Sequence, residues 1–439
     1  MGKNANRAAL RWLEEVFSGS PSEKPEILKG VRVVEMATRI FGPYTGDLLA
    51  QLGAEVIKIE MPGAGDLMRY VTPEGYFWKN ASVGFFPQNR NKYHVGLDLH
   101  YEEGKEIFRE LVRRSDVVLE NLKAGTMDRW GLGYLQLREI NPKIIYAANT
   151  GFGQWGPFSL GRPSYDATAQ AVSGMSEITG FPGRPPLKVG IYIGDFTGAL
   201  TSAFAILVAL YHREKTGKGQ FIDVAQAEVL IRILDWTWAY TSLKGKPRTR
   251  VGNMDPAVPP SGVFRCRDGF VALSAVTPEQ WRGFVSALGD LVPEEIRLLE
   301  DPLERTKGEI PEALDEITGK WCSSMKVEEV LSAAQKGGFV AVKVQNARDH
   351  YESGHLRARK SVWEVEDELY GTVTEYGPPP KFSDSPMRLK WEAKPVGYHN
   401  EFVFKEILGL GQEEMARLEE KGVIGRWDDR PGACPPEKS

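Results

Sequence analysis

The sequence predicts an α/β fold built on a parallel sheet. Short apolar runs, typical of buried strands, alternate along the chain with longer segments that are typical of helices. This alternation is the pattern of parallel strands joined by helical crossovers. The 46 glycines and 28 prolines supply the tight connections that such a fold needs. With 439 residues, the chain is long enough for two or three domains.

The predicted elements alternate throughout the first part of the chain. Strands are expected over residues 31–36, 54–59, 116–119, 143–148 and 220–224, and helices over residues 6–17, 43–52, 105–113, 167–172, 197–213 and 225–238. Pro43 suits the first turn of its helix, and Gly53 suits the end of that helix. Ligands of parallel sheets bind at the carboxyl ends of strands, so the loops after residues 37, 60, 120 and 149 are expected to form a site.

A change of composition marks the second part. Residues 244–261 are rich in glycine, proline and charge, which indicates a domain boundary. A second α/β unit is expected from residue 262 to about residue 373, with a strand over 270–274 and helices over 280–288 and 327–336. Two helices, over 400–409 and 413–421, are expected to close the chain.

Charge and composition exclude several classes of protein. A net charge of -4 leaves no basic excess to neutralise a nucleic acid. Cys266, Cys322 and Cys434 lack disulfide and zinc spacing, which indicates a reducing cytoplasm. No run of 18 apolar residues occurs, and the charged N-terminal helix is not a signal peptide, so no membrane segment is expected. The histidines lack ligand spacing and nucleotide-loop patterns are missing, so neither a metal ion nor a prosthetic group is expected.

Acidic and basic residues in loops are the candidates for chemistry. Asp195 follows Gly194 ahead of a predicted helix, where it is either an N-cap or a nucleophile held ionised by helix amides. Asp166 follows Tyr165 and is either a second cap or part of a ligand site. A third group is basic and serves either as surface charge or as phosphate ligands: Arg69, Arg90, Lys92, Lys123 and Arg129.

An ordered series of short segments runs from residue 28 to residue 424. It comprises residues 28–35, Gly42-Pro43, residues 52–60, Pro62 with Gly65-Asp66 and Arg69, residues 89–92, 97–99, 118–121, 128–131 and 151–154, Tyr165-Asp166 with Gln170-Ala171, Gly194-Asp195, and residues 216–220. In this series the sequence resembles the family III CoA-transferases. The resemblance implies a Rossmann-like large domain (residues 28–245 and 380–439), a smaller inserted α/β domain (246–379) and an N-terminal extension (1–27). It also implies an interlocked dimer.

The resemblance further implies a nucleophile and a set of contacts. Asp195 is the implied nucleophile, which would form an aspartyl anhydride with the acyl group of an acyl-CoA and then an aspartyl–CoA thioester. The CoA thioester is thus a substrate, and no prosthetic group is implied. The implied CoA contacts are Arg39, Leu97, His100, Asn121, Leu122, Lys123 and Arg129, and the implied substrate contacts are Ile40, Phe41, Tyr165 and Asp166. His100, Ile40 and Met61 replace a lysine, a polar residue and an arginine of other members.

Two other functions stay open. An α-methylacyl-CoA racemase pairs an aspartate, here Asp166, with a histidine, but no histidine lies between residues 101 and 211. The chain is alternatively one subunit of a hetero-oligomeric CoA-transferase, paired with a related chain, and Asp195 then marks it as the competent one.

The choice of substrates rests on bulky side chains. With Ile40 and Phe41, the aromatic side chains of Trp78, Trp236, Trp238 and Tyr240 are either core residues or the lining of an apolar pocket. The second interpretation favours succinyl-CoA as the donor and an arylsuccinate, such as benzylsuccinate, as the acceptor.

Overall fold

The computed structural model describes residues 12–17, 20–159 and 162–427. Within these residues the chain forms two compact units. The first unit comprises the chain up to Ser173, residues 190–233 and the chain from His355 onward. The second unit comprises residues 174–189 and 234–354.

A six-stranded parallel sheet forms the centre of the first unit, which confirms the predicted α/β fold with a parallel sheet. Its strands are β1 (Arg32–Met36), β2 (Glu55–Glu60), β5 (Tyr93–Gly96), β6 (Val117–Glu120), β7 (Ile145–Thr150) and β8 (Phe221–Ala225). They lie in the order β5-β2-β1-β6-β7-β8, and every neighbouring pair is parallel. The chain moves outward from β1 in one direction and from β6 in the other. The chain therefore leaves β1 and β6 in opposite directions, at the position in such sheets where ligands bind.

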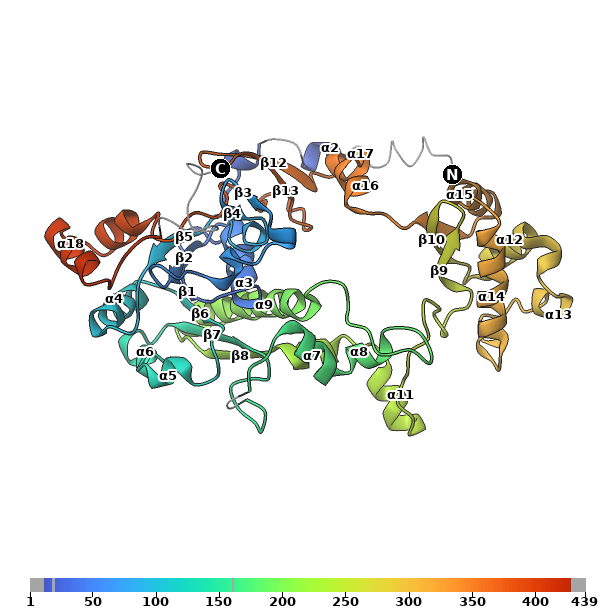
Figure 1. The fold of residues 1–439 in the computed structure, drawn as a ribbon, viewed down its shortest axis with the longest axis horizontal. Helices are drawn as coiled ribbons and strands as arrows, with labels where there is room; N and C mark the ends of the chain where they lie inside the picture. Colours follow the sequence, from blue (N-terminus) through green and yellow to red (C-terminus); the bar gives the residue numbers. More distant parts are fainter. Residues whose placement is uncertain (1–11, 18–19, 160–161, 428–439) are drawn as a thin grey trace. The chain divides into compact units, whose positions relative to one another are not determined.

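Helices cover both faces of this sheet (Figure 1). The helices α4 (Glu102–Arg113), α6 (Tyr134–Ile140) and α18 (Gln412–Glu420) pack on one face, and α3 (Phe41–Gln51) and α9 (Ile193–Thr216) pack on the other. In β1, Val33 faces the core that contains Ile206 of α9. The next residue, Val34, faces the opposite core, which contains Phe108 of α4. Since both faces are buried, most strand residues are apolar, as the short apolar runs predicted, and the buried charges Glu35 and Lys58 are paired with each other.

Smaller elements complete the first unit. Its short helices are α2 (Trp12–Val16), α5 (Thr126–Arg129), α7 (Asp166–Ser173) and α10 (Gln226–Arg232), together with a π-helical segment (Glu401–Ile407). Its two hairpins join β3 (Phe77–Trp78) with β4 (Ala81–Ser82) and β12 (Val362–Asp367) with β13 (Gly371–Tyr376). The helix α17 (Gly354–Ala358) begins at the last residue of the second unit.

The second unit has an antiparallel sheet and its own core. The strands β9 (Ser261–Cys266), β10 (Gly269–Ser274) and β11 (Val340–Lys343) lie in the order β11-β10-β9. The helices are α8 (Met175–Ile178), α11 (Thr237–Lys244), α12 (Pro278–Leu288), α13 (Glu294–Arg297), α14 (Ile310–Ser323), α15 (Val327–Gly337) and α16 (Ala347–Tyr351). Trp281, Phe284 and Leu314 are fully buried between them.

Three predicted helices differ from the observed ones. The helix predicted over 225–238 is interrupted, because α10 ends at Arg232, Asp235 adopts a left-handed φ of 45°, and α11 begins at Thr237. The helix predicted from residue 197 begins earlier, at Ile193. Of the helix predicted over 6–17, the residues before Trp12 lie outside the described part of the chain.

The helix α9 has an unusual composition for a surface element. Its 24 residues make it, among the described residues, the one helix long and apolar enough to cross a membrane, although no membrane segment was expected. A core helix of a water-soluble protein meets the same criterion, and α9 packs through Ile206 and Ala209 against the central sheet. Its other face carries exposed apolar side chains.

Candidate active site

The loop after β1 begins the site, and a buried carboxylate fixes its shape. Arg39 adopts a left-handed φ of 70°, which is costly for a residue with a side chain. Asp66 offsets that cost, because its Oδ1 accepts hydrogen bonds from Arg39 N and Thr38 Oγ1, both at 2.7 Å. The same oxygen accepts a third bond from Met68 N at 3.0 Å. The Asp66 carboxylate therefore fixes the turn that presents Arg39.

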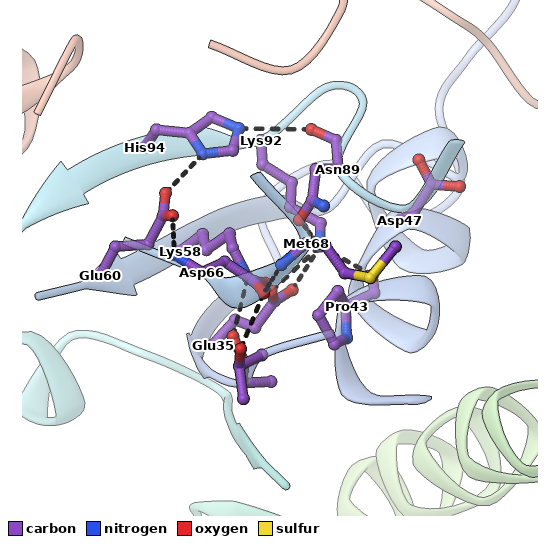
Figure 2. Close-up of polar contacts among 12 residues, drawn as sticks. Glu35, Pro43, Asp47, Lys58, Glu60, Asp66, Met68, Asn89, Lys92 and His94 are labelled. Carbon is purple, nitrogen blue, oxygen red and sulfur yellow. Dashed lines mark hydrogen bonds and ion pairs between the residues drawn. The ribbon is translucent and has the colours of Figure 1, made fainter. Parts of the chain in front are cut away.

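A buried ion cluster anchors Asp66 in turn (Figure 2). Lys58 Nζ lies 2.9 Å from Asp66 Oδ2 and 3.1 Å from Glu35 Oε1, and it donates to Ala37 O at 2.7 Å. Burial acts to lower the pKa of Lys58, but the charges of Asp66 and Glu35 outweigh it and raise that pKa. Lys58 thus stays charged and ties the end of β1 to the loop.

A second lysine of the cluster, Lys92, directly precedes β5. Lys92 Nζ lies 2.7 Å from Glu35 Oε2 and donates to Pro43 O at 2.7 Å. Burial lowers the pKa of Lys92 to about 8, although Glu35 opposes this change. Glycine is required at position 46 of α3, because a Cβ there would lie 1.9 Å from Glu35 Oε2. The cluster therefore fixes α3 as well as the loop (Figure 2).

Three basic residues considered as surface charges or phosphate ligands are instead buried in ion pairs. Arg69 donates two hydrogen bonds of 2.7 Å to Glu60, and Arg90 pairs with Asp47 at 3.2 Å. Arg69, Arg90 and Lys92 are each 5% exposed or less. These two partners and the partner of Lys92 lie 9 to 57 positions away, so the local pattern did not reveal them.

Asn121 joins the two diverging loops at the centre of the sheet. Its Oδ1 accepts from Thr38 N at 2.8 Å, and its Nδ2 donates to Thr38 O at 2.7 Å. The next residue, Leu122, donates from its backbone N to Glu120 Oε2 at 2.7 Å. Burial raises the pKa of Glu120 to about 8, and the Leu122 N–H opposes this rise. Asn121 therefore holds the backbone of the Arg39 turn in place.

The remaining implied CoA contacts divide into exposed and buried residues. Lys123 and Arg129 are exposed on the segment after β6, where Arg129 Nη2 donates to Thr126 Oγ1 at 2.8 Å. His100 is exposed after β5, and its Nδ1 lies 2.7 Å from Asp98 Oδ1. Leu97, by contrast, is 1% exposed and belongs to the core. The structure thus leaves three basic side chains open to a ligand on this edge of the sheet.

The start of α9 carries Asp195, and the N-cap interpretation of this residue is wrong. The N-cap is Tyr192, and Asp195 is the third residue of the helix. Asp166, the first residue of α7, provides the cap from a different helix, because its Oδ1 accepts from Gly194 N at 2.7 Å. Its Oδ2 accepts from Gln170 Nε2 at 2.5 Å. Asp166 therefore fixes the turn that presents Asp195.

The carboxylate of Asp195 is held by an amide. Gln226 Nε2, on the first residue of α10, donates to Asp195 Oδ1 at 2.9 Å. Burial raises the pKa of Asp195 to about 7, the Asp166 charge adds to the rise, and the Gln226 hydrogen bond and Arg39 oppose it. A carboxylate that titrates near neutral pH in a partly open position is suited to react with a substrate.

Arg39 and Tyr165 meet beside these carboxylates. The Arg39 guanidinium lies 4.2 Å from the centre of the Tyr165 ring, and its Nη2 donates to the Tyr165 hydroxyl at 3.1 Å. Arg39 Nε is buried without a hydrogen-bond partner among the described residues. Ile40 and Phe41 are each 4% exposed, so both side chains belong to the core that supports the turn.

The aromatic residues considered for a pocket lie in different units. Trp78 belongs to the first unit, where its Nε1 donates to Tyr370 O at 3.2 Å. Trp236, Trp238 and Tyr240 belong to the second unit. Trp236 is the N-cap of α11, Trp238 and Tyr240 lie within that helix, and the ring centres of Trp236 and Tyr240 are 5.3 Å apart. Each unit therefore presents its own aromatic group.

Sequence reasoning missed two residues of this site, Asp66 and Gln226, as individual candidates. Gln226 lies two residues after the strand predicted over 220–224, near the carboxyl end where ligands bind, and this position was the available signal. Asp66 lies in the loop after another predicted strand. The hydrogen bonds that tie them to Arg39 and Asp195 join residues 27 and 31 positions apart.

Comparison with known proteins now defines the class. The family model described as CoA-transferase family III matches residues 28–400. The succinyl-CoA–D-citramalate CoA-transferase of Chloroflexus aurantiacus is 33% identical over 409 residues, which cover 92% of this chain and 100% of that protein. The succinyl-CoA:mesaconate CoA-transferase of Haloarcula marismortui is 36% identical over 348 residues, which cover 77% of this chain and 85% of that protein.

A solved structure agrees with these matches. The crystal structure of a CaiB/BaiF family protein from Brucella suis superposes with a TM-score of 0.76 at 32% identity, covering 87% of this chain and 99% of that chain. The protein is therefore an enzyme that transfers CoA, with CoA thioesters as substrates. The chain belongs to CoA-transferase family III, as the sequence resemblance predicted.

Proposed function

We propose that this enzyme moves CoA from succinyl-CoA to a carboxylic acid, with Asp195 as the nucleophile. The observation that carries the proposal is the Asp195 carboxylate itself, which is presented at the carboxyl edge of the sheet with a pKa of about 7. The donor is supported by relatives whose names include succinyl-CoA. A cytoplasmic location fits the free, buried thiols of Cys266 and Cys322.

Four covalent steps account for the transfer. Asp195 Oδ2 attacks the acyl carbonyl of succinyl-CoA, the C–S bond breaks, and an aspartyl–succinyl anhydride and CoA thiolate form. The thiolate then attacks Asp195 Cγ and releases succinate, which leaves an aspartyl–CoA thioester. The acceptor carboxylate attacks Cγ and releases the thiolate again, and the thiolate finally attacks the acceptor carbonyl and frees Asp195. The energy of the thioester is retained, so no other activating reactant enters.

Basic side chains are proposed to hold the CoA. Lys123, Arg129 and His100 are exposed at the carboxyl edge, where cations can pair with phosphates. Asn121, Leu122 and Leu97 form the supporting frame beneath them. Arg39 is proposed to face the acyl end, because its turn adjoins the Asp195 site through Tyr165.

The proposed acceptor is a dicarboxylic acid. Arg39 Nε, which has no hydrogen-bond partner in the described part of the chain, is close enough to influence the Asp195 carboxylate, and it would pair with the second carboxylate of such an acid. Tyr165 and Asp166 would border the acceptor, with Ile40 and Phe41 shaping the turn from below. An arylsuccinate such as benzylsuccinate is the bulky member of this class.

The racemase alternative lacks a proton partner in this structure. Among the described residues, Asp166 accepts hydrogen bonds from Gly194 N and Gln170 Nε2, and no histidine is bonded to it. An exchange of α-protons without CoA transfer would nevertheless favour that alternative, so the transfer assay should monitor both.

The test of the proposed function is the variant Asp195→Asn. Asparagine keeps the oxygen that accepts from Gln226 but cannot form the anhydride, so transfer should fall by at least about 10³-fold with the fold unchanged. Asp290→Asn, at an exposed aspartate of the second unit, is the control and should keep full activity. Hydroxylamine with succinyl-CoA should label Asp195, as read by peptide mass spectrometry. Labelling of Asp166 instead would contradict the assignment.

We also propose that the enzyme is a dimer of two copies, interlocked as in its family. The face of α9 turned away from the sheet carries four apolar side chains at helical spacing: Leu200, Phe204, Val208 and Tyr211, which are 49–67% exposed. A contiguous exposed apolar stripe of this kind is typical of a protein interface. The proposed partner is a second copy of this chain, and a related chain is the alternative.

A further inference from the structure

Gln226 is placed so that its side chain bonds to the proposed nucleophile. It is the first residue of α10, directly after β8, and it is 3% exposed. Its Nε2 donates to Asp195 Oδ1 at 2.9 Å. This approach depends on Gly194, because a Cβ at that position would lie 3.1 Å from Gln226 Cγ and also 3.1 Å from Asp166 Oδ1. The glycine beside the nucleophile therefore makes room for the amide.

The hydrogen bond makes the two oxygens of Asp195 unequal. Within the described residues, Gln226 is the one hydrogen-bond donor to this carboxylate, and it occupies Oδ1. Oδ2 is the oxygen that keeps its lone pairs available for attack. Once Oδ2 has bonded to an acyl group, Oδ1 becomes the carbonyl oxygen of the anhydride, and it keeps that role in the aspartyl–CoA thioester.

We propose that Gln226 is a catalytic residue whose amide N–H stabilises the negative charge that forms on Asp195 Oδ1. This role rests on the proposed function, in which Asp195 forms the covalent intermediates. When the CoA thiolate attacks Cγ of the anhydride, the electron pair of the Cγ–Oδ1 double bond moves onto Oδ1. The tetrahedral species then re-forms that double bond and expels succinate, which carries away Oδ2. Attack of the acceptor carboxylate on the thioester repeats this charge on Oδ1 and expels the thiolate.

A preorganised amide donor at such an oxygen lowers the barrier in proportion to the charge that develops there. The amide is buried, so water does not compete for the hydrogen bond. The two steps at the acyl carbonyls of the substrates do not place charge on Oδ1 and gain nothing from Gln226. Two of the four steps therefore need this side chain, and two do not.

The test is the rate at which CoA becomes attached to Asp195. The enzyme is mixed with succinyl-CoA alone, quenched with acid, and analysed by intact-protein mass spectrometry, which distinguishes a CoA adduct from a succinyl adduct. Gln226→Leu removes the donor, and Gln226→Glu keeps the size but replaces the N–H with an oxygen. Both variants should form the CoA adduct about 100-fold more slowly than the wild type. The KM for succinyl-CoA should change little, because Gln226 bonds to Asp195 and not to the substrate.

A matched control separates catalysis from stability. Gln51→Leu also removes a buried amide donor to a carboxylate, since Gln51 Nε2 donates to Asp47 Oδ2 at 2.6 Å in α3. This variant should keep the wild-type rate of adduct formation. Wild-type rates in both Gln226 variants, or an equal loss in Gln51→Leu, would overturn the role of Gln226. If the wild-type enzyme itself forms no adduct at Asp195, the proposed function fails and this role fails with it. If Gln226→Leu does not fold, the rate of adduct formation in Gln226→Glu alone tests the role of Gln226.

Discussion

Burial and an aspartate from a different helix set the protonation state of Asp195, the proposed nucleophile. Asp166 caps the first turn of α9 through Gly194 N, and its negative charge adds to the effect of burial on Asp195. Both effects favour the protonated form, so the pKa of Asp195 rises to about 7. In the proposed mechanism only the ionised form attacks an acyl-CoA, so the fraction of reactive enzyme would depend on pH in the neutral range.

Formation of the CoA adduct should therefore rise with pH to a plateau, with a midpoint near 7 set by Asp195. Asp166→Asn removes a like charge, which should lower the pKa of Asp195 and move the midpoint down by on the order of one pH unit. Arg39→Met removes a nearby cation and should move the midpoint up. Rapid-quench rates measured between pH 5 and about 9 check both shifts. A midpoint that moves in the opposite direction in either variant contradicts this electrostatic account.

At the scale of elements, the close approach of α3 and α9 depends on a glycine. A Cβ at position 198 would lie 2.7 Å from Cε2 and 2.8 Å from Cζ of Phe41, a core residue in the first turn of α3. The ring would have to shift, and with it the loop that carries Arg39. The helix pair therefore links the start of α9 to the turn after β1.

Gly198→Ala should destabilise the first unit by about 1–3 kcal/mol, because the steric cost exceeds the gain in helix propensity. Gly319→Ala is the matched control: Gly319 lies inside α14, and a Cβ there would meet no atom within 4 Å. This second variant should stabilise its unit by up to about 1 kcal/mol. Urea unfolding of both variants gives the comparison. A stabilised Gly198→Ala protein would show that the Phe41 ring moves aside without a loss of stability.

Periodicity predicted most central elements, and it failed where partners are distant. The strands β1, β2, β6, β7 and β8 were predicted because buried parallel strands are apolar runs. The strand β5 was missed because it contains His94, whose burial lowers its pKa to about 4 beside Glu60. The break after α10 depends on the left-handed backbone of Asp235, and no local sequence pattern predicted that conformation.

The two aspartates of the candidate site could be singled out from the sequence, but the residues that position them could not. Asp195 and Asp166 were found from their neighbours Gly194 and Tyr165 and from the family resemblance. Gln226 and Asp66 were not found, because a hydrogen bond between residues far apart in the sequence produces no recognisable spacing in it.

At the scale of the whole molecule, α9 combines two properties. Its first turn carries Asp195, and its outer face carries the exposed stripe of Leu200, Phe204, Val208 and Tyr211. If a second copy covers this stripe, as proposed, the dimer interface and the nucleophile lie on one continuous helix. Dissociation would then expose apolar surface directly beside the active site.

Phe204→Glu should convert the dimer to a monomer, because it places a charge at the most exposed apolar side chain of the stripe. Leu135→Glu, which changes an equally exposed leucine on α6, should leave the dimer intact. Sedimentation equilibrium measures the mass of each. A wild-type protein that is monomeric alone and associates only with a related chain would favour the hetero-oligomer. A Phe204→Glu protein that remains dimeric would place the interface elsewhere.

The ion cluster beneath the Arg39 turn has a consequence for the salinity in which the enzyme works. Lys58, Glu35, Asp66 and Lys92 have fully buried side chains, so mobile ions cannot come between them. The ion pairs on the outside of α4 are exposed to solvent, where 0.1 M salt already screens charges over roughly 10 Å. Rising ionic strength therefore weakens the surface pairs of α4, and it would also weaken the proposed attraction of Lys123 and Arg129 for the phosphates of CoA. The turn that presents Arg39 keeps its geometry throughout.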